Sequence, residues 1–176
     1  MNYFAQWATN NIIYLGNMTF TPDDYKFMKT AAELAEKNID ENGGPFGAVI
    51  VRDGEIIATG VNRVTADNDP TSHAEVNAIR SACRKENTFK LDKCIIYSSC
   101  EPCPMCLSAI YWAGISRIYY GNTQDDADTI DFSDKFIYSE LDKPKVERAI
   151  PCIHMPNDFT IKAFNKWRNK SDKIEY

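Results

Sequence analysis

The sequence predicts an α/β sandwich with a mixed sheet of about five strands. First, residues 46–51 and 55–61 are β-rich runs separated by Arg52, Asp53 and Gly54, and Asp-Gly between such runs is a strong signal for an antiparallel hairpin. Second, residues 91–98, 103–113 and 117–120 have the patterns of a strand, a helix and a strand. Short connections between them predict a right-handed parallel crossover.

A helix is expected before the hairpin. Residues 21–24, Thr-Pro-Asp-Asp, are typical of a helix start, because the hydroxyl can cap, proline suits the first turn and acids favour the positive end of the helix dipole. Apolar residues at helical spacing follow until Gly43 and Gly44 end the pattern. They are Tyr25, Met28, Ala32, Ala35 and Ile39.

Later elements follow from the same signals. After a polar loop, Thr71 or Ser72 can cap a helix that runs to about Arg84. Beyond Gly121 the chain becomes acidic and irregular. A short helix is expected within residues 131–144, a last strand over residues 150–153, and a final helix capped by Asn157 or Asp158.

Composition and charge limit the class of protein. With 176 residues, 44% of them hydrophobic and 26% charged, the chain can bury a core as one domain, residues 21–176, after an extension at residues 1–20. Its 20 basic against 25 acidic residues argue against a protein that neutralises many phosphates of a nucleic acid. We see no secretory signal and no apolar run long enough to cross a membrane, and expect a cytoplasmic protein.

Three of the six cysteines, Cys100, Cys103 and Cys106, are crowded together, which indicates a metal site rather than a disulfide scaffold. Cys103 and Cys106 are three residues apart, so on a helix they share a face. With His73 they make a set of ligands that suits zinc. A helix N-terminus also lowers the pKa of a thiol and favours the thiolate that binds the metal.

Three protein ligands leave a fourth position open for water, as in catalytic zinc sites. Glu75, two residues after His73, can approach that position from an open helix end and move protons without binding zinc. The alternative is that Cys100 closes a structural Cys3His site. We favour the open site, because the residue before Pro102 is extended and can direct Cys100 away. The remaining cysteines and the second histidine are not expected to bind the metal. Cys83, Cys94 and Cys152 are expected in the core, and His154 at the surface or in a packing role.

These motifs resemble the zinc nucleobase deaminases of the cytidine deaminase superfamily. The resemblance rests on GGPFGAVIV at residues 43–51, NDPTSHAEVNAIR at 68–80 and SSCEPCPMCLSAIYWA at 98–113. DKFIYSELDKP at 134–144 and the C-terminal WRN and tyrosine resemble the bacterial-type guanine deaminases more narrowly. The resemblance implies a three-layer α/β/α cytidine deaminase-like fold and hydrolysis of guanine to xanthine and ammonia.

The resemblance also implies roles for individual residues. Zn²⁺ is held by His73, Cys103 and Cys106, and Glu75 is the catalytic proton carrier. The base is bound by Asn62, Phe46, Trp112, Asp134 and Tyr176, with backbone groups near Ala74 and Cys103. Asp134 and Tyr176 belong to a segment, residues 125–176, that the resemblance implies is exchanged between subunits of a domain-swapped homodimer. Without the resemblance, Phe46 and Trp112 are expected in the core, Asn62 and Asp134 as caps, and Tyr176 in a disordered tail.

Other functions remain open. The zinc signature defines the reaction and not the ring, so cytosine, cytidine or guanosine are alternative substrates. A tRNA adenosine deaminase shares the signature but needs a positive surface, which the net charge of -5 and the acidic segment 125–128 disfavour. A non-catalytic, zinc-stabilised module is the third alternative. We expect a small purine base as partner, and neither a nucleic acid nor a membrane.

Overall fold

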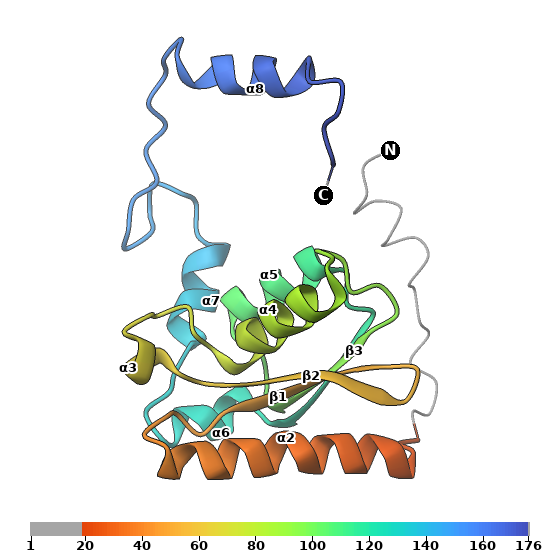
Figure 1. Ribbon diagram of the computed structural model, residues 1–176. Coiled ribbons are helices and arrows are strands. Elements are labelled where there is room, and N and C mark those ends of the chain that lie inside the picture. The colour runs from red at the N-terminus through yellow and green to blue at the C-terminus, as the bar shows by residue number, and fades with distance from the viewer. Residues whose placement is uncertain (1–18, 176) are drawn as a thin grey trace. The chain divides into compact units, whose positions relative to one another are not determined.

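A mixed sheet with strand order β2-β1-β3-β4 lies at the centre of the first of two units in this computed structural model (Figure 1). The structure describes residues 19–175, so nearly all of the expected extension, and Tyr176, lie outside the described residues. The first unit ends at Asp134, and the second spans Lys135 onward.

The predicted hairpin is present. Strand β1 (Gly47–Arg52) pairs antiparallel with β2 (Glu55–Val61), and the two-residue turn between them is Asp53 and Gly54. Both turn residues have positive φ, 52° and 80°, which is the conformation that Asp-Gly favours in hairpins.

The predicted crossover is present as well. Strand β3 (Ile95–Cys100) runs antiparallel to β1 and parallel to β4 (Arg117–Asn122), and helix α5 (Pro104–Ala113) connects β3 to β4. Strand β3 begins at Ile95 and not at residue 91 as expected. Lys93 has a positive φ of 64°, and the N–H of Leu91 donates to the carbonyl of Ala113 rather than to a neighbouring strand.

Helices cover both faces of the sheet and form the three layers that the resemblance implies (Figure 1). Helix α2 (Pro22–Asp40) lies on one face, and α4 (Ala74–Glu86) with α5 on the other. Side chains of a strand alternate between faces, so Val49 and Val51 join the α2 side while Ala48 and Ile50 join the α4 side.

Two glycines let the helices approach the sheet closely. A Cβ at Gly47 would lie 2.4 Å from the carbonyl oxygen of Ala31 on α2. A Cβ at Gly60 would lie 2.2 Å from the carbonyl oxygen of Ala74 and 2.4 Å from the nitrogen of Ala78, both on α4. Only glycine fits such approaches, so both helix positions are set by direct backbone contact with the sheet.

The helix starts confirm one prediction and correct another. Thr21 caps α2 in a capping box with Asp24, as expected. Helix α4 begins at Ala74 with His73 at the N-cap, not at Thr71 or Ser72. The hydroxyls of Thr71 and Ser72 donate to Asp69 and Asp67 instead, so they hold the preceding loop, which includes α3 (Val64–Asp67).

The remaining segments are mainly helical. Helix α6 (Gln124–Asp128) belongs to the first unit, and α7 (Lys135–Asp142) and α8 (Thr160–Arg168) to the second. The N-cap of α8 is Phe159 and not Asn157 or Asp158 as predicted, although Oδ1 of Asn157 accepts from the N–H groups of Phe159 and Thr160. The predicted strand at residues 150–153 was wrong, because the second unit contains only helices in its described part and offers no strand to pair with. The described sheet therefore has four strands.

None of the helices within residues 19–175 is long and apolar enough to cross a membrane.

Candidate metal centre and active site

The three predicted metal ligands meet at one point. Ligand atoms of His73, Cys103 and Cys106 all lie within 4.8 Å of one another. The Nδ1 atom of His73 is 3.6 Å from Sγ of Cys103 and 3.5 Å from Sγ of Cys106. Two thiols and one imidazole are the donor set of a zinc site with a free coordination position, so the residues present fit that metal.

Helix starts position these ligands. His73 is the N-cap of α4 and Cys103 the N-cap of α5, and neither side chain caps its own helix with a hydrogen bond. Pro104 occupies the first turn of α5, where its missing N–H costs nothing. Cys106 lies one turn inside α5, on the same side as Cys103. Both ligand-bearing segments therefore present the positive ends of their helix dipoles, which favour thiolate.

The electrostatics of the metal-free chain favour a thiolate at Cys103 but not at Cys106. Contact with Cys106 and His73, acting against burial, holds the pKa of Cys103 well below the ordinary value of a thiol. The pKa of His73 is raised, chiefly by its contact with Cys103. Contact with Cys103 and burial raise the pKa of Cys106 in the metal-free chain. A divalent cation bound between the two sulfurs would offset the repulsion between two thiolates. The arrangement of the donor atoms therefore suits a bound cation.

Glu75 lies beside the ligands without joining them. Its side chain is buried, with only 6% exposed, and Oε1 accepts a 2.9 Å hydrogen bond from the hydroxyl of Ser98 on β3. Burial raises the pKa of Glu75, although the hydrogen bonds oppose this. Sequence reasoning missed Ser98; its signal is a pair of adjacent serines, Ser98 and Ser99, in an apolar strand that leads into the cysteine cluster.

Cys100 lies apart from the ligand group. Its thiol, at the end of β3, faces the carbonyl oxygen of Thr123 at 3.7 Å, and burial raises its pKa to about 11. This geometry favours the open site over a closed Cys3His site. Of the other cysteines, Cys94 is buried and Cys83 packs against the core, whereas Cys152 is exposed and its predicted place in the core was wrong.

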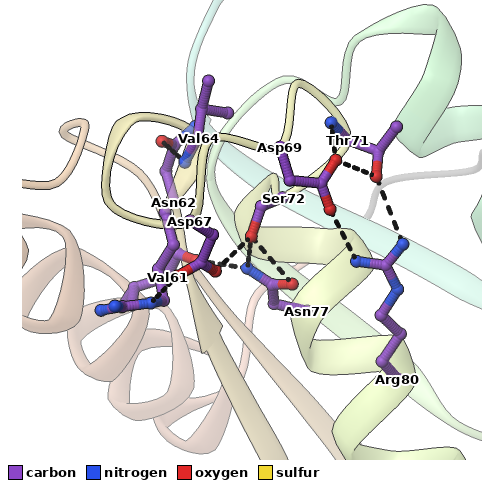
Figure 2. A network of polar contacts seen from close by, with 10 residues as sticks. Val61, Asn62, Val64, Asp67, Asp69, Thr71, Ser72, Asn77 and Arg80 are labelled. Atoms are coloured by element: carbon purple, nitrogen blue, oxygen red, sulfur yellow. Dashed lines mark hydrogen bonds and ion pairs between the residues drawn. The ribbon is translucent and has the colours of Figure 1, made fainter.

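A polar network holds the loop that leads into His73 (Figure 2). Ser72 donates to Asp67 at 3.0 Å, and Nδ2 of Asn77 donates to Ser72 at 3.0 Å and to the carbonyl of Val61 at 2.9 Å. Since Asn77 is on α4 and Val61 ends β2, the network joins helix, loop and sheet. The backbone before the histidine is thereby fixed from both sides.

Asn62, at the end of β2, is predicted to bind the base. It is 7% exposed, and its Oδ1 accepts a 3.2 Å bond from the N–H of Val64, the turn contact expected without the resemblance (Figure 2). Within the described residues, no acceptor is assigned to its Nδ2. Phe46, the residue before β1, is partly buried, and its ring meets that of Phe132 edge to face with the ring centroids 5.0 Å apart.

Three other predicted pocket residues, Ala74, Trp112 and Asp134, belong to the first unit. Ala74 is fully buried, while Trp112 is 56% exposed and so is not a core residue. The pKa of Asp134 is raised, mainly by burial and secondly by the charge of Cys103, so Asp134 lies close to the metal ligands. Its Oδ1 is buried and has no hydrogen-bond partner among the described residues. Tyr176 lies outside the described residues.

Known proteins resemble this chain in sequence and fold. A guanine deaminase of Bacillus subtilis is 52% identical over 85% of this chain and 97% of its own length. The X-ray structure of guanine deaminase from B. subtilis superposes with a TM-score of 0.84, at 51% identity, over 86% of this chain and 98% of that chain. A tRNA-specific adenosine deaminase of Aquifex aeolicus is 31% identical over 81% of this chain and 95% of its own length.

A further crystal structure, solved in complex with 8-azaguanine, has a TM-score of 0.61 and 34% identity over 63% of this chain and 65% of that chain. Residues 21–122 match the family described as the cytidine and deoxycytidylate deaminase zinc-binding region. That match contains all three metal ligands and Glu75. The chain therefore belongs to the cytidine and deoxycytidylate deaminase zinc-binding family.

Proposed function

We propose that this chain hydrolyses guanine to xanthine and ammonia. The observation that carries the proposal is the placement of a buried carboxyl, Glu75, beside a zinc-binding His-Cys-Cys site that uses only three protein ligands. The 52% identity to the guanine deaminase of B. subtilis supports guanine as the base.

When bound, zinc supplies a Lewis acid that lowers the pKa of water to about 7. Glu75 takes one proton from the attacking water and delivers it to a ring nitrogen; it then takes the second proton, from the hydroxyl that has been added to the ring carbon, and delivers it to the leaving amine. One carboxyl thus serves as base and then as acid in each transfer. Burial, which raises the pKa of Glu75, suits a group that must hold a proton between these steps. Ser98 fixes the carboxyl by its bond to Oε1.

Two polar groups in this region are available to a purine. Nδ2 of Asn62 can donate to a ring nitrogen or carbonyl, and Oδ1 of Asp134 can accept from a ring N–H or an amine. Phe46 offers an aromatic face. A crystal structure of a relative contains 8-azaguanine, a purine-like base, which supports a small base as the ligand.

We also propose that the second unit is exchanged between subunits of a homodimer. Its large apolar side chains remain exposed in the single chain, which is unusual unless another surface covers them. Five of them are at least 71% exposed: Val146, Ile150, Ile153, Met155 and Phe164. The resemblance implies exchange of residues 125–176, which includes Asp134. Because the first unit ends at Asp134, we propose the narrower exchange of the second unit with Tyr176, so that Asp134 stays in its own subunit.

The setting we propose is the cytoplasm. All six cysteines are free in this chain, as expected for a reducing compartment.

The test is ammonia release from guanine, guanosine, cytosine, cytidine, adenine and adenosine, with zinc content measured on the same sample. We expect guanine to be preferred. Preference for another base would overturn the substrate and leave the deaminase mechanism in place. Zinc-loaded protein that releases no ammonia from any of them, while releasing it from tRNA, would favour the tRNA alternative.

A further inference from the structure

Asn38 is a buried amide near the end of α2, and it joins two loops of the base-binding region. Its side chain is 2% exposed. Nδ2 donates to the carbonyl oxygen of Gly44 at 2.8 Å and to that of Asn62 at 2.7 Å. Both protons of one amide therefore bond backbone carbonyls, one that lies 6 residues and one that lies 24 residues further along the chain.

The two carbonyls lie next to residues that we place at the base. Gly44 precedes Phe46 by two residues, and the N–H of Asn62 donates to the carbonyl of Phe46 at 3.1 Å. The carbonyl of Asn38 itself accepts from the N–H of Gly43 at 2.8 Å. Asn38 thus contacts both chain segments, 43–46 and 62, through three hydrogen bonds.

Close packing holds the side-chain amide of Asn38 in a single orientation. A Cβ at Gly43 would lie 2.1 Å from Nδ2 of Asn38, and one at Gly44 would lie 3.0 Å from Oδ1 of Asn62. The two glycines therefore pack directly on the two amides. Oδ1 of Asn38 is buried without a partner among the described residues, so the orientation of this amide is determined by its two donor bonds.

We propose that Asn38 is a positioning residue for the base: it holds the backbone of Asn62 so that the Asn62 amide faces the substrate. The proposal rests on the proposed function, because that function gives Asn62 its contact with the base. Asn38 lies on α2, on the opposite face of the sheet from the helices that supply the metal ligands, and a defect there is expected to affect binding of the base and not zinc content.

The kinetic test uses Asn38→Ala, Asn62→Ala and the double variant in the zinc-loaded protein. Asn38→Ala is expected to raise KM for guanine on the order of tenfold with kcat changed far less. If Asn38 acts through Asn62, adding Asn38→Ala to Asn62→Ala raises KM little further. Additive effects in this cycle would overturn the proposal.

Phe27→Leu is the matched control, because Phe27 is a buried residue of the same helix that packs on Tyr97 and not on residues 43–46 or 62. It is expected to lower the thermal unfolding midpoint while leaving KM unchanged. An equal rise of KM in this control would show that Asn38→Ala acts through general loss of stability, and would contradict the proposal.

A second measurement does not depend on activity. Amide hydrogen exchange is expected to accelerate at residues 62–64 in Asn38→Ala and in Asn38→Asp, which keeps the shape but loses the donors. Exchange in α4 is expected to stay unchanged. Unaltered exchange at residues 62–64 would refute the positioning role. Absence of guanine turnover by the unsubstituted protein would refute the proposed function, and the exchange result would still decide on Asn38.

Discussion

The hydroxyl of Ser98 donates a 2.9 Å hydrogen bond to Oε1 of Glu75 and so connects strand β3 to the first turn of α4. The bond lies in a buried site, since Ser98 is 1% and Glu75 6% exposed. In such surroundings a hydrogen bond to a carboxylate both orients the group and reduces the penalty for its charge. The pair therefore sets the position of the carboxyl that moves protons.

Replacing this carboxyl is expected to stop the reaction without removing the metal. Glu75→Gln keeps the size of the side chain but cannot exchange protons, so kcat is expected to fall by about 10² to 10⁴-fold. Ammonia release and zinc content, measured together, check this. Loss of zinc in the variant would mean that Glu75 is a ligand instead.

Ser98→Ala is expected to reduce kcat by about tenfold, because the carboxyl loses the bond that orients it. Ser99→Ala serves as control: Ser99 is the neighbouring residue on β3, and its hydroxyl accepts from the N–H of Gly47 at 3.0 Å. The control is expected to lose stability and keep kcat. Equal kcat losses in both variants would contradict a specific role for Ser98.

The metal site is expected to tolerate change at Cys100 and not at Cys106. Cys100→Ser leaves His73, Cys103 and Cys106 in place, so zinc content and ammonia release are expected to stay near those of the unsubstituted protein. Cys106→Ser removes a ligand and is expected to lose both. Metal analysis after gel filtration decides, and loss of zinc from Cys100→Ser would indicate a fourth cysteine ligand.

Stability is expected to depend on pH through Asp24. Partial burial raises its pKa, but hydrogen bonds from Tyr97, at 2.6 Å, and Thr21 outweigh burial, so the pKa is lowered from 3.8. A lowered pKa means that the carboxylate stabilises the fold above the unfolded pKa of about 3.9, and that this contribution is lost as pH falls through the folded pKa.

Tyr97→Phe removes the strongest of these bonds. It is expected to lower the free energy of unfolding by about 1 kcal/mol at pH 7, a modest figure because Asp24 is partly exposed to solvent. The difference from the unsubstituted protein is expected to shrink below about pH 4, where Asp24 becomes protonated. Urea unfolding at several pH values measures it, and a difference that stays constant down to pH 2 would refute the ionic contribution.

Exchange of the second unit predicts complementation between two inactive chains. Glu75→Gln impairs the proton carrier, and Tyr176→Ala impairs the terminal residue that we assign to the partner's site. Random mixing of the two in refolded dimers is expected to restore about a quarter of the unsubstituted activity, because half the dimers then contain one complete site. Each variant refolded alone is the control, and no recovery on mixing would exclude an exchanged Tyr176.

Local sequence signals were sufficient for much of the architecture. The Asp53-Gly54 turn, the capping box at Thr21 and the crossover through α5 all depend on neighbouring residues, and the structure confirms them. The strand expected at residues 150–153 was wrong because strand formation needs a partner, and the pattern of one segment does not show whether a partner exists.

The metal ligands were predicted from their residue types and spacing, and the structure places their ligand atoms within 4.8 Å of one another. The predicted start of α4 was wrong. Thr71 and Ser72 are residue types that often cap helices, but their hydroxyls donate to Asp69 and Asp67 instead. Ser98 and Asn38 were missed for a related reason. Their roles come from contacts with residues 23 and 24 positions away, which no local pattern contains.

Gly60 shows how far the demands of the metal centre extend. It lies on β2 directly under the backbone of α4, at Ala74 and Ala78, and His73 precedes that point of contact by a single residue. The distance between sheet and helix at Gly60 therefore determines how far the imidazole reaches toward the two sulfurs. A side chain at Gly60 would push α4 away from the sheet and so move His73 relative to Cys103 and Cys106.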